Sequence, residues 1–142
     1  MSLKAVHYIN QFYAGIGGET MADTGFGILE EKKGPALGLE QLWNGEMTIS
    51  KVVYCGDNYV NNDENYGEVK EKLAKVIREE KPDVFIAGPA FNAGRYGVAC
   101  AKVCDYVRSE LGVPSVTCMW HENPAIDLSL IHISEPTRLG MI

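Results

Sequence analysis

The sequence predicts an α/β fold, an open and mostly parallel Rossmann-like sheet with flanking helices. Two observations lead to this prediction. Apolar, strand-like segments alternate along the chain with segments that have the 3.6-residue period of a helix. The connections between them are short, which is typical of strand–helix–strand units. Such units favour parallel pairing with right-handed crossovers, because the helix must pack back onto the sheet.

Four segments are predicted as strands because they are short and rich in β-branched, aromatic or other apolar residues. They are Leu3–Ile9, Ile49–Tyr54, Asp83–Ala87 and Val113–Met119. The turn formers Gly56-Asp57-Asn58 follow the second strand, and Gly88-Pro89 is expected to stop the third.

Asp63–Glu80 is predicted as a helix, with Asp63 as its N-cap and Pro82 at its end. Its apolar residues fall at helical spacing. They are Tyr66, Val69, Leu73, Val76 and Ile77. A second helix is expected from about Tyr96 to Leu111, with Gly112 as its C-terminal stop. Ala14–Gly45 is predicted as mostly loop, with one short helix near Leu39–Trp43.

Composition excludes several classes of protein. The formal net charge is −6 and the pI is near 5.0, which disfavours nucleic-acid binding. Mean hydropathy is −0.11, and no run approaches the roughly 18 apolar residues of a membrane span. The first residues lack the layout of a signal peptide, and the four cysteines form no Cys-x-x-Cys pair. We therefore expect reduced thiols, a cytoplasmic protein and no contact with membranes.

The end of the chain is expected to be foreign to the fold. Leu128–Arg138 resembles the translation of a sequencing adapter. Residues 128–142 are therefore predicted to be a non-native tail, and residues 1–127 to be the N-terminal α/β portion of a longer, truncated protein.

Candidate binding residues gather where the predicted strands end. Ligands of open parallel sheets bind outside the carboxyl ends of the strands, where the following loops converge. The polar residues in these loops, together with one glycine, are Asp57, Asn58, Asn92, Gly94, Arg95, His121, Glu122 and Asn123. They are predicted to bind substrate.

The run Gly88–Gly97 is the most unusual of these loops, because it is rich in glycine and leads into a helix. The backbone amides of Gly94–Gly97 could face a carboxylate or phosphate, with Arg95 supplying charge. A tight turn whose arginine pairs with a neighbouring carboxylate is the alternative.

Other motifs favour structural roles. Gly15-Ile16-Gly17-Gly18 lacks the spacing of a dinucleotide fingerprint and favours a loop. Cys100 and Cys104 lie on an apolar helix face, which favours core packing over metal binding, so no metal site is expected. Cys55 is the candidate reactive thiol, although no base is evident. His7 is expected to be a core histidine, and His121 either an acid–base group or part of a turn.

Several blocks resemble the selenoprotein B subunit of glycine, sarcosine and betaine reductases. The blocks are Lys4–Glu19, Cys55–Tyr59 and Phe85–Gly97, together with His121–Pro124, which matches a Glu-Asn-Pro element of the family. Their order is that of the family, and the resemblance covers Lys4–Asp127. The D-proline reductase subunit is a related but more distant possibility.

This resemblance implies an oxidoreductase that cleaves a carbon–nitrogen bond reductively with a thiol/disulfide reductant. It implies a pyruvoyl group on a partner subunit and a selenocysteine downstream of this chain, so no catalytic residue is expected here. The implied partners are the pyruvoyl-containing subunit, selenoprotein A, an acetyl-phosphate-forming component and the thioredoxin system.

Two alternatives stay open from the residues themselves. The chain could be a non-catalytic Rossmann-like module that binds a small carboxylate or a nucleotide. It could also be a structural half that only docks a partner subunit. The sequence does not choose between glycine, sarcosine and betaine as the substrate.

Overall fold

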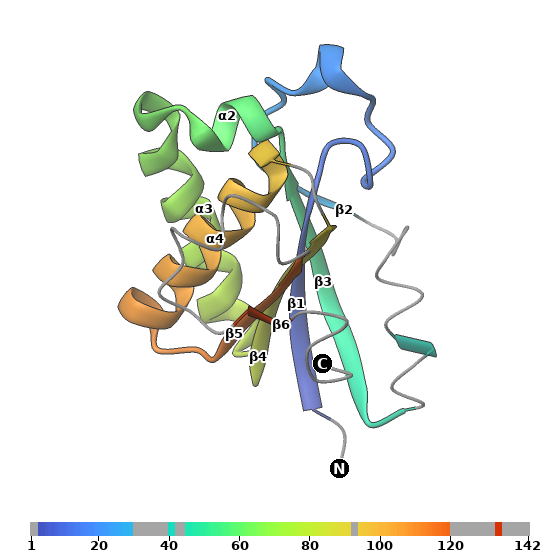
Figure 1. Cartoon of the computed structure of the whole chain (residues 1–142). Helices are drawn as coiled ribbons and strands as arrows, with labels where there is room; N and C mark the ends of the chain where they lie inside the picture. The colour runs from blue at the N-terminus through green and yellow to red at the C-terminus, as the bar shows by residue number, and fades with distance from the viewer. Residues whose placement is uncertain (1–2, 30–39, 42–44, 92–93, 120–132, 135–142) are drawn as a thin grey trace.

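The fold is built on a single β-sheet. The computed structural model describes residues 3–29, 40–41, 45–91, 94–119 and 133–134. Six strands lie in the order β2-β3-β1-β4-β5-β6 (Figure 1). They are β1 (Leu3–Asn10), β2 (Gly27–Leu29), β3 (Met47–Cys55), β4 (Val84–Phe91), β5 (Ser115–Met119) and β6 (Ile133–Ser134). All neighbours are parallel except β2 and β3, so the prediction of an α/β, mostly parallel sheet is confirmed.

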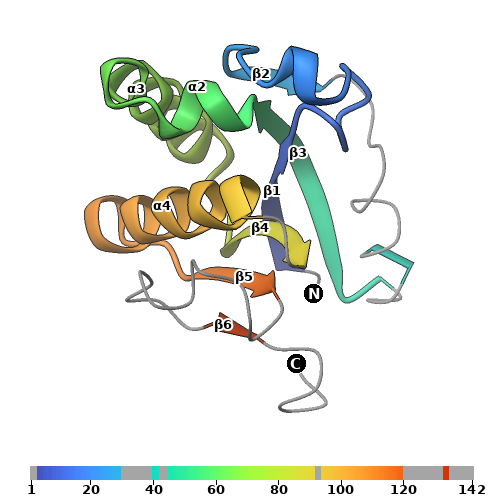
Figure 2. The same cartoon turned by 45° about the horizontal axis from the view of Figure 1, so that its top comes forward.

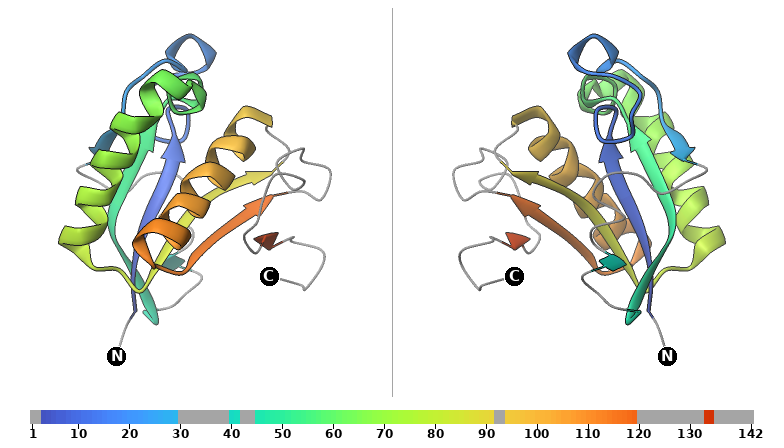
Figure 3. Two further views of the ribbon diagram at one scale, coloured as in Figure 1. Left: turned by 90° about the vertical axis from the view of Figure 1, so that its left-hand side faces the viewer. Right: turned by 90° about the vertical axis from the view of Figure 1, so that its right-hand side faces the viewer.

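Helices α3 (Asp63–Glu80) and α4 (Gly94–Leu111) pack on one face of this sheet, and the short helix α2 (Asp57–Asn61) contacts both of them at one end of the sheet. The 3₁₀ helix η1 (Glu19–Met21) lies in the segment that follows β1. Figures 2 and 3 show α3 and α4 side by side on the same face. The main core lies between them and the sheet, where Tyr8, Leu73 and Phe85 are fully buried. A smaller cluster around Ala5, Ile9 and Ile49 is buried on the other face.

Helix α3 has the predicted bounds, because its apolar period is regular. Four of the five predicted apolar residues are buried, and Tyr66 packs against the core at its edge. The predicted N-cap was wrong by one residue. Asn62 caps the helix, since its side-chain oxygen accepts from the Glu64 amide (2.9 Å), and Asp63 is the first helical residue. Lys81 ends the helix in the left-handed conformation, with φ of 48°.

Strand β4 is longer than predicted, because Gly88 does not stop it. Gly88 has a φ of 103°, and the register with β5 shifts between Ala87 and Phe91. The strand therefore kinks and continues, as a bulge allows. Other boundaries differ from the prediction by one or two residues; for example, α4 begins at Gly94, and β5 begins at Ser115, after Pro114. Gly112 follows α4 with a φ of 71°, as predicted for its stop.

Several short elements were not predicted, among them α2 and β2. Gly56-Asp57-Asn58 was expected to be a turn, but Asp57 starts α2. The amides of Asn58 and Tyr59 donate to the Ala22 carbonyl, and the Gly56 amide donates to Thr24 (2.8 Å), so tertiary contacts hold this helix start in place. β2 is a three-residue edge strand within a region expected to be loop. Such short elements depend on their partners more than on local propensity.

Two predictions fall largely outside the described residues. Residues 40 and 41 are helical, as expected near Leu39–Trp43, and the rest of that segment is not described. Within the predicted tail, only β6 is described, and it pairs with β5 through Thr117 and Ile133. The boundary at residue 127 therefore stays a prediction. Among the helices that the structure describes, none is long and apolar enough to cross a membrane.

Gly56 provides a test of how α2 is held. A Cβ atom at this position would lie 2.7 Å from the Thr24 amide nitrogen and even closer to the Ala22 carbonyl oxygen, both rigid backbone atoms. We expect Gly56→Ala to lower the free energy of unfolding by about 2 kcal/mol or more, measured by urea denaturation. Gly67→Ala is the matched control, because Gly67 lies in α3 with nothing within 4 Å of the added methyl. It should raise stability by up to about 1 kcal/mol. Equal effects of the two substitutions would contradict this account.

Candidate functional site

The strand order reverses between β1 and β4. The chain passes from β1 to β3 on one side, then crosses β1 to reach β4, and continues from β4 to β5 on the other side. In open parallel sheets, ligands bind at the carboxyl ends of the strands where the strand order reverses, which here is the edge formed by the ends of β1 and β4. α2 and the first turn of α4 lie at this end of the sheet (Figure 1). The predicted position of the site agrees with this topology.

Two adjacent amides at the end of β1, Asn10 and Gln11, organise this edge, and we call them the amide clamp. Both are nearly fully buried. The Asn10 side chain donates to Asp57 Oδ2 (3.1 Å) and accepts from the amides of Phe12 and Tyr13 (both 3.1 Å). Gln11 Oε1 accepts from the Asp57 amide (3.2 Å), and Gln11 Nε2 donates to Gly18 O (3.4 Å). The clamp thus fixes both the loop after β1 and the start of α2.

Asp57 is the central charged group of the edge. It is 8% exposed, and its Oδ1 atom has no hydrogen-bond partner. Burial raises the pKa of Asp57 to about 6, while the hydrogen bond from Asn10 acts in the opposite direction. A buried carboxyl group with a free oxygen and a pKa near neutrality is typical of a functional site.

Arg95 joins α4 to α2 at the same edge. Its Nη1 atom donates to Asn58 Oδ1 (2.6 Å), and its backbone carbonyl accepts from Asn61 Nδ2 (3.0 Å). Arg95 itself is exposed. Asn58 follows Asp57 directly, so the guanidinium group is held close to the element that carries the buried carboxyl group.

Aromatic side chains pack beneath these groups. Tyr8 on β1 and Tyr96 on α4 are fully or almost fully buried, and neither hydroxyl has a hydrogen-bond partner. The ring of Tyr13 lies 5.7 Å from that of Tyr96, and Phe12, which is 62% exposed, packs edge-on against Tyr13. Polar and aromatic side chains therefore both lie near this end of the sheet.

The structure brings part of the predicted site together. Asp57, Asn58 and Arg95 lie at the carboxyl end of the sheet as expected, and Gly94 is the first residue of α4. Asn92, His121, Glu122 and Asn123 lie outside the described residues. The amide clamp was missed, because Asn10 and Gln11 close a strand-like segment. The signal was present in the sequence: two consecutive amides interrupt an otherwise apolar run at a strand end.

The other candidate groups have structural roles. His7 is buried, as predicted, and its Nε2 donates to Gly88 O (2.6 Å). Burial raises the pKa of Cys55 to about 12, which argues against its role as a reactive thiol. Cys100 and Cys104 are buried in the core with raised pKa values, as their position on the apolar face of α4 predicted. Within the described part of the chain, no three His, Cys, Asp or Glu side chains gather as a metal site would require.

The glycine-rich loop leads into η1, a single 3₁₀ turn, rather than into an α-helix. Gly15, with φ of 80°, and Gly17, with φ of 157°, adopt backbone conformations that favour glycine. A phosphate-binding loop presents the first amides of a following α-helix, which is not the arrangement here. The interpretation as a structural loop is supported.

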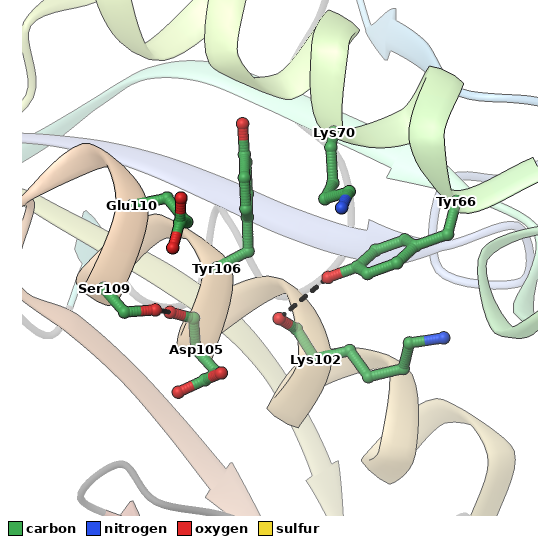
Figure 4. Close-up of a pocket in the computed structure, with 7 residues that line it drawn as sticks. All are labelled: Tyr66, Lys70, Lys102, Asp105, Tyr106, Ser109 and Glu110. Atoms are coloured by element: carbon green, nitrogen blue, oxygen red, sulfur yellow. Dashed lines mark hydrogen bonds between the residues drawn. The ribbon is translucent and has the colours of Figure 1, made fainter. Parts of the chain in front are cut away.

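A second hollow, of about 430 Å³, lies between α3 and α4 (Figure 4). Lys102 Nζ lies 4.3 Å from the centre of the Tyr66 ring and Lys70 Nζ lies 5.2 Å from it, and the Tyr66 hydroxyl donates to Lys102 O (3.0 Å). These contacts join the two helices. No predicted site residue lines this hollow.

Comparison with known proteins gives a consistent result. Residues 2–134 match the protein family described as glycine/sarcosine/betaine reductase selenoprotein B. The chain is similar to two proteins of Peptoclostridium acidaminophilum over 126 residues, which is 89% of this chain. It is 44% identical to the sarcosine reductase complex component B subunit beta. It is 46% identical to the glycine reductase complex component B subunit gamma. The betaine reductase complex component B subunit beta of the same organism is 37% identical over 125 residues.

The chain spans only 28% of the length of these relatives. No solved structure matches it significantly.

Asp57 allows a test of the site through stability. Its pKa is about 6 in the folded protein, against 3.8 for an unperturbed carboxyl group, so ionisation opposes folding above pH 6. We expect Asp57→Asn to raise the free energy of unfolding at pH 7 by about 1–3 kcal/mol. The gain should shrink as the pH falls from 6 towards 4, where Asp57 is protonated in the folded state. Urea denaturation across this pH range measures it. The exposed Asp105→Asn is the control, and a gain that grows towards acid pH would contradict the assignment.

Proposed function

The chain belongs to the glycine/sarcosine/betaine reductase selenoprotein B family, and on this basis we propose that it forms a substrate-binding portion of a component B subunit. The reaction is the reductive cleavage of the carbon–nitrogen bond of a small amino acid or methylated amine. The proposal follows the names of the curated relatives, which are component B subunits of glycine, sarcosine and betaine reductase complexes.

One observation carries the proposal beyond the family. α2 and α4 place a carboxyl group and a guanidinium group at the same end of the sheet, and Asn58 links the two helices. A small amino acid is a zwitterion, so it needs an anionic partner for its nitrogen and a cationic partner for its carboxylate. Asp57 and Arg95 supply these two partners. In this proposal, Asn92, Gly94, His121, Glu122 and Asn123 contribute to the same substrate site.

The described residues bind and orient, and the redox chemistry comes from elsewhere. A selenolate or thiolate is the nucleophile that such cleavage needs. The sequence contains no selenocysteine, and the described thiols are buried with raised pKa values. We therefore assign the selenolate to another part of the subunit and the pyruvoyl group to a partner subunit. Selenoprotein A, an acetyl-phosphate-forming component and the thioredoxin system complete the proposed reaction cycle.

Arg95 tests the substrate-binding role. We expect Arg95→Ala to weaken glycine binding by about tenfold or more, because a charged hydrogen bond contributes roughly 1.5–3 kcal/mol. Isothermal titration calorimetry with glycine, sarcosine, betaine and ATP measures the affinities. Arg108→Ala is the matched control, since Arg108 lies on the same helix and pairs only with Asp105 in the described structure. Tight binding of ATP together with no effect of Arg95→Ala would favour the nucleotide-binding alternative.

The proposal that the redox chemistry comes from outside this chain gives a second test. We expect the 142-residue chain, supplied with thioredoxin, thioredoxin reductase, NADPH and glycine, to release no ammonia, because the sequence has no selenocysteine and the described thiols are buried with raised pKa values. Ammonia is measured by an enzyme-coupled assay, with a complete component B preparation and its partner components as the positive control. Thioredoxin-dependent ammonia release by the chain alone would contradict the proposal.

A further inference from the structure

His7 is a polar residue in an otherwise apolar row on β1. It is fully buried on the sheet face opposite α3 and α4, between Ala5 and Ile9 of the smaller core cluster. Its Nε2 atom lies 2.6 Å from Gly88 O on β4, and its Nδ1 atom has no hydrogen-bond partner among the described residues. An unpaired buried acceptor costs stability, and an apolar side chain would pack in this row without that cost. The hydrogen bond to Gly88 is therefore a feature that packing alone does not explain.

The protonation state of the His7 ring follows from its partner. A carbonyl oxygen only accepts, so Nε2 carries the proton and Nδ1 does not. Burial lowers the pKa of His7 to about 4, while the hydrogen bond to Gly88 acts in the opposite direction. The ring is therefore neutral at pH 7 and acts as a fixed hydrogen-bond donor from β1 to β4.

Gly88 is the point at which β4 leaves the regular ladder. The pairing of β4 with β1 ends at Ala87, and its pairing with β5 resumes only at Phe91. Residues 88–90 of β4 therefore stand opposite a single residue of β5. Gly88 has a φ of 103°, and β4 bends away from β1 towards its carboxyl end (Figure 3). Without a registered partner on either neighbouring strand, the Gly88 carbonyl receives a donor from His7.

This bulge decides where α4 begins. Three residues against one leave a surplus of two, which takes up about 6–7 Å of strand length. Beyond the bulge, Phe91 pairs with Met119, and α4 starts at Gly94 with Arg95 in its first turn. Arg95 then meets α2, where Asn58 Oδ1 accepts from its Nη1 atom. Because a bulge re-aims the side chains that follow it, the position of Arg95 depends on this one.

We propose that His7 is a positioning residue of the candidate site: through Gly88 O it holds the bulge of β4, and the bulge sets the place of Arg95 at the carboxyl end of the sheet. This inference rests on the proposed function, in which Arg95 binds the substrate carboxylate. His7 itself does not contact the substrate. Its role needs a neutral donor, because a charge buried in this apolar cluster would be costly. A glutamine side chain, which also ends in an N–H donor, is the conservative replacement.

A double-mutant cycle tests the link between His7 and Arg95. His7→Leu removes the donor and should weaken glycine binding about fivefold, measured by calorimetry on the full chain at neutral pH. His7→Gln keeps a donor and should stay within about twofold of the original affinity. In an Arg95→Ala background, His7→Leu should change the affinity by less than about twofold, because the effects of residues that act through one another are not additive. Ile49→Val, buried on the same face of the sheet, is the control for a general loss of stability.

Hydrogen exchange gives a readout that needs no ligand. His7→Leu should raise the exchange rates of backbone amides at least about tenfold both at the end of β4 and in the first turn of α4, Gly94–Gly97. His7→Gln and Ile49→Val should leave these rates within about twofold. Long-range ¹H–¹⁵N NMR should find the ring proton of His7 on Nε2. If His7→Leu does not fold, His7→Met replaces it, because a methionine side chain adapts to irregular gaps.

The outcomes separate this inference from the proposed function. The positioning role is overturned by faster exchange that is confined to β4, by equal effects of His7→Leu and His7→Gln, by an equal effect of His7→Leu in both backgrounds, or by a ring proton on Nδ1. If glycine, sarcosine and betaine all fail to bind the unsubstituted chain, the proposed function fails. Exchange in the first turn of α4 then still decides whether His7 holds the start of this helix.

Discussion

The hydrogen bonds of the amide clamp are the interaction on which the arrangement of the functional edge depends. Asn10 and Gln11 lie at the end of the central strand β1, and they reach both the loop that follows and the first residue of α2. Helix α2 in turn holds Arg95 through Asn58 and Asn61. Loss of a hydrogen bond by a buried amide is costly, so the clamp fixes the loop after β1 and the start of α2, and α2 in turn contacts α4.

Two buried groups at the end of the sheet oppose folding in different pH ranges: Asp57 does so when it is ionised, and His7 does so when the unfolded chain is protonated. The pKa of Asp57 is raised to about 6, so its contribution weakens the fold as pH rises from about 4 to 6. Burial lowers the pKa of His7 to about 4, from 6.5, so protonation of the unfolded chain weakens the fold as pH falls through the same range. The two slopes have opposite signs. Retaining a buried carboxyl group that costs stability at neutral pH is typical of sites kept for function.

Much of the fold could be predicted because regular elements bury regular patterns. The helical period of Asp63–Glu80 predicted both ends of α3. The four predicted strands are present in the sheet as β1, β3, β4 and β5. The misses share a physical cause, which is that tertiary contacts decided the local structure. Ala22 and Thr24 turn Gly56-Asp57-Asn58 into a helix start, and a left-handed Gly88 lets β4 pass a Gly-Pro pair. Ala22 and Thr24 do not enter the local propensity of this segment, because they lie far from it in the sequence.

In the candidate site, too, the sheet topology could be predicted from the sequence, whereas the individual hydrogen bonds could not. The rule that ligands bind at the carboxyl ends of parallel strands was sufficient to predict that Asp57, Asn58 and Arg95 lie at one edge. The rule does not predict that Asp57 Oδ1 is left without a hydrogen-bond partner. That detail depends on Asn10 and Gln11, which occupy the other acceptor and the backbone donor of Asp57. The described thiols are buried in the core, whereas Asp57 and Arg95 lie at the carboxyl end of the sheet, and this arrangement supports the proposal that this part of the protein binds a small ion while the reactive group comes from elsewhere. Separating the two keeps a strong nucleophile away from a buried carboxylate, whose negative charge would raise the pKa of that nucleophile and slow its chemistry.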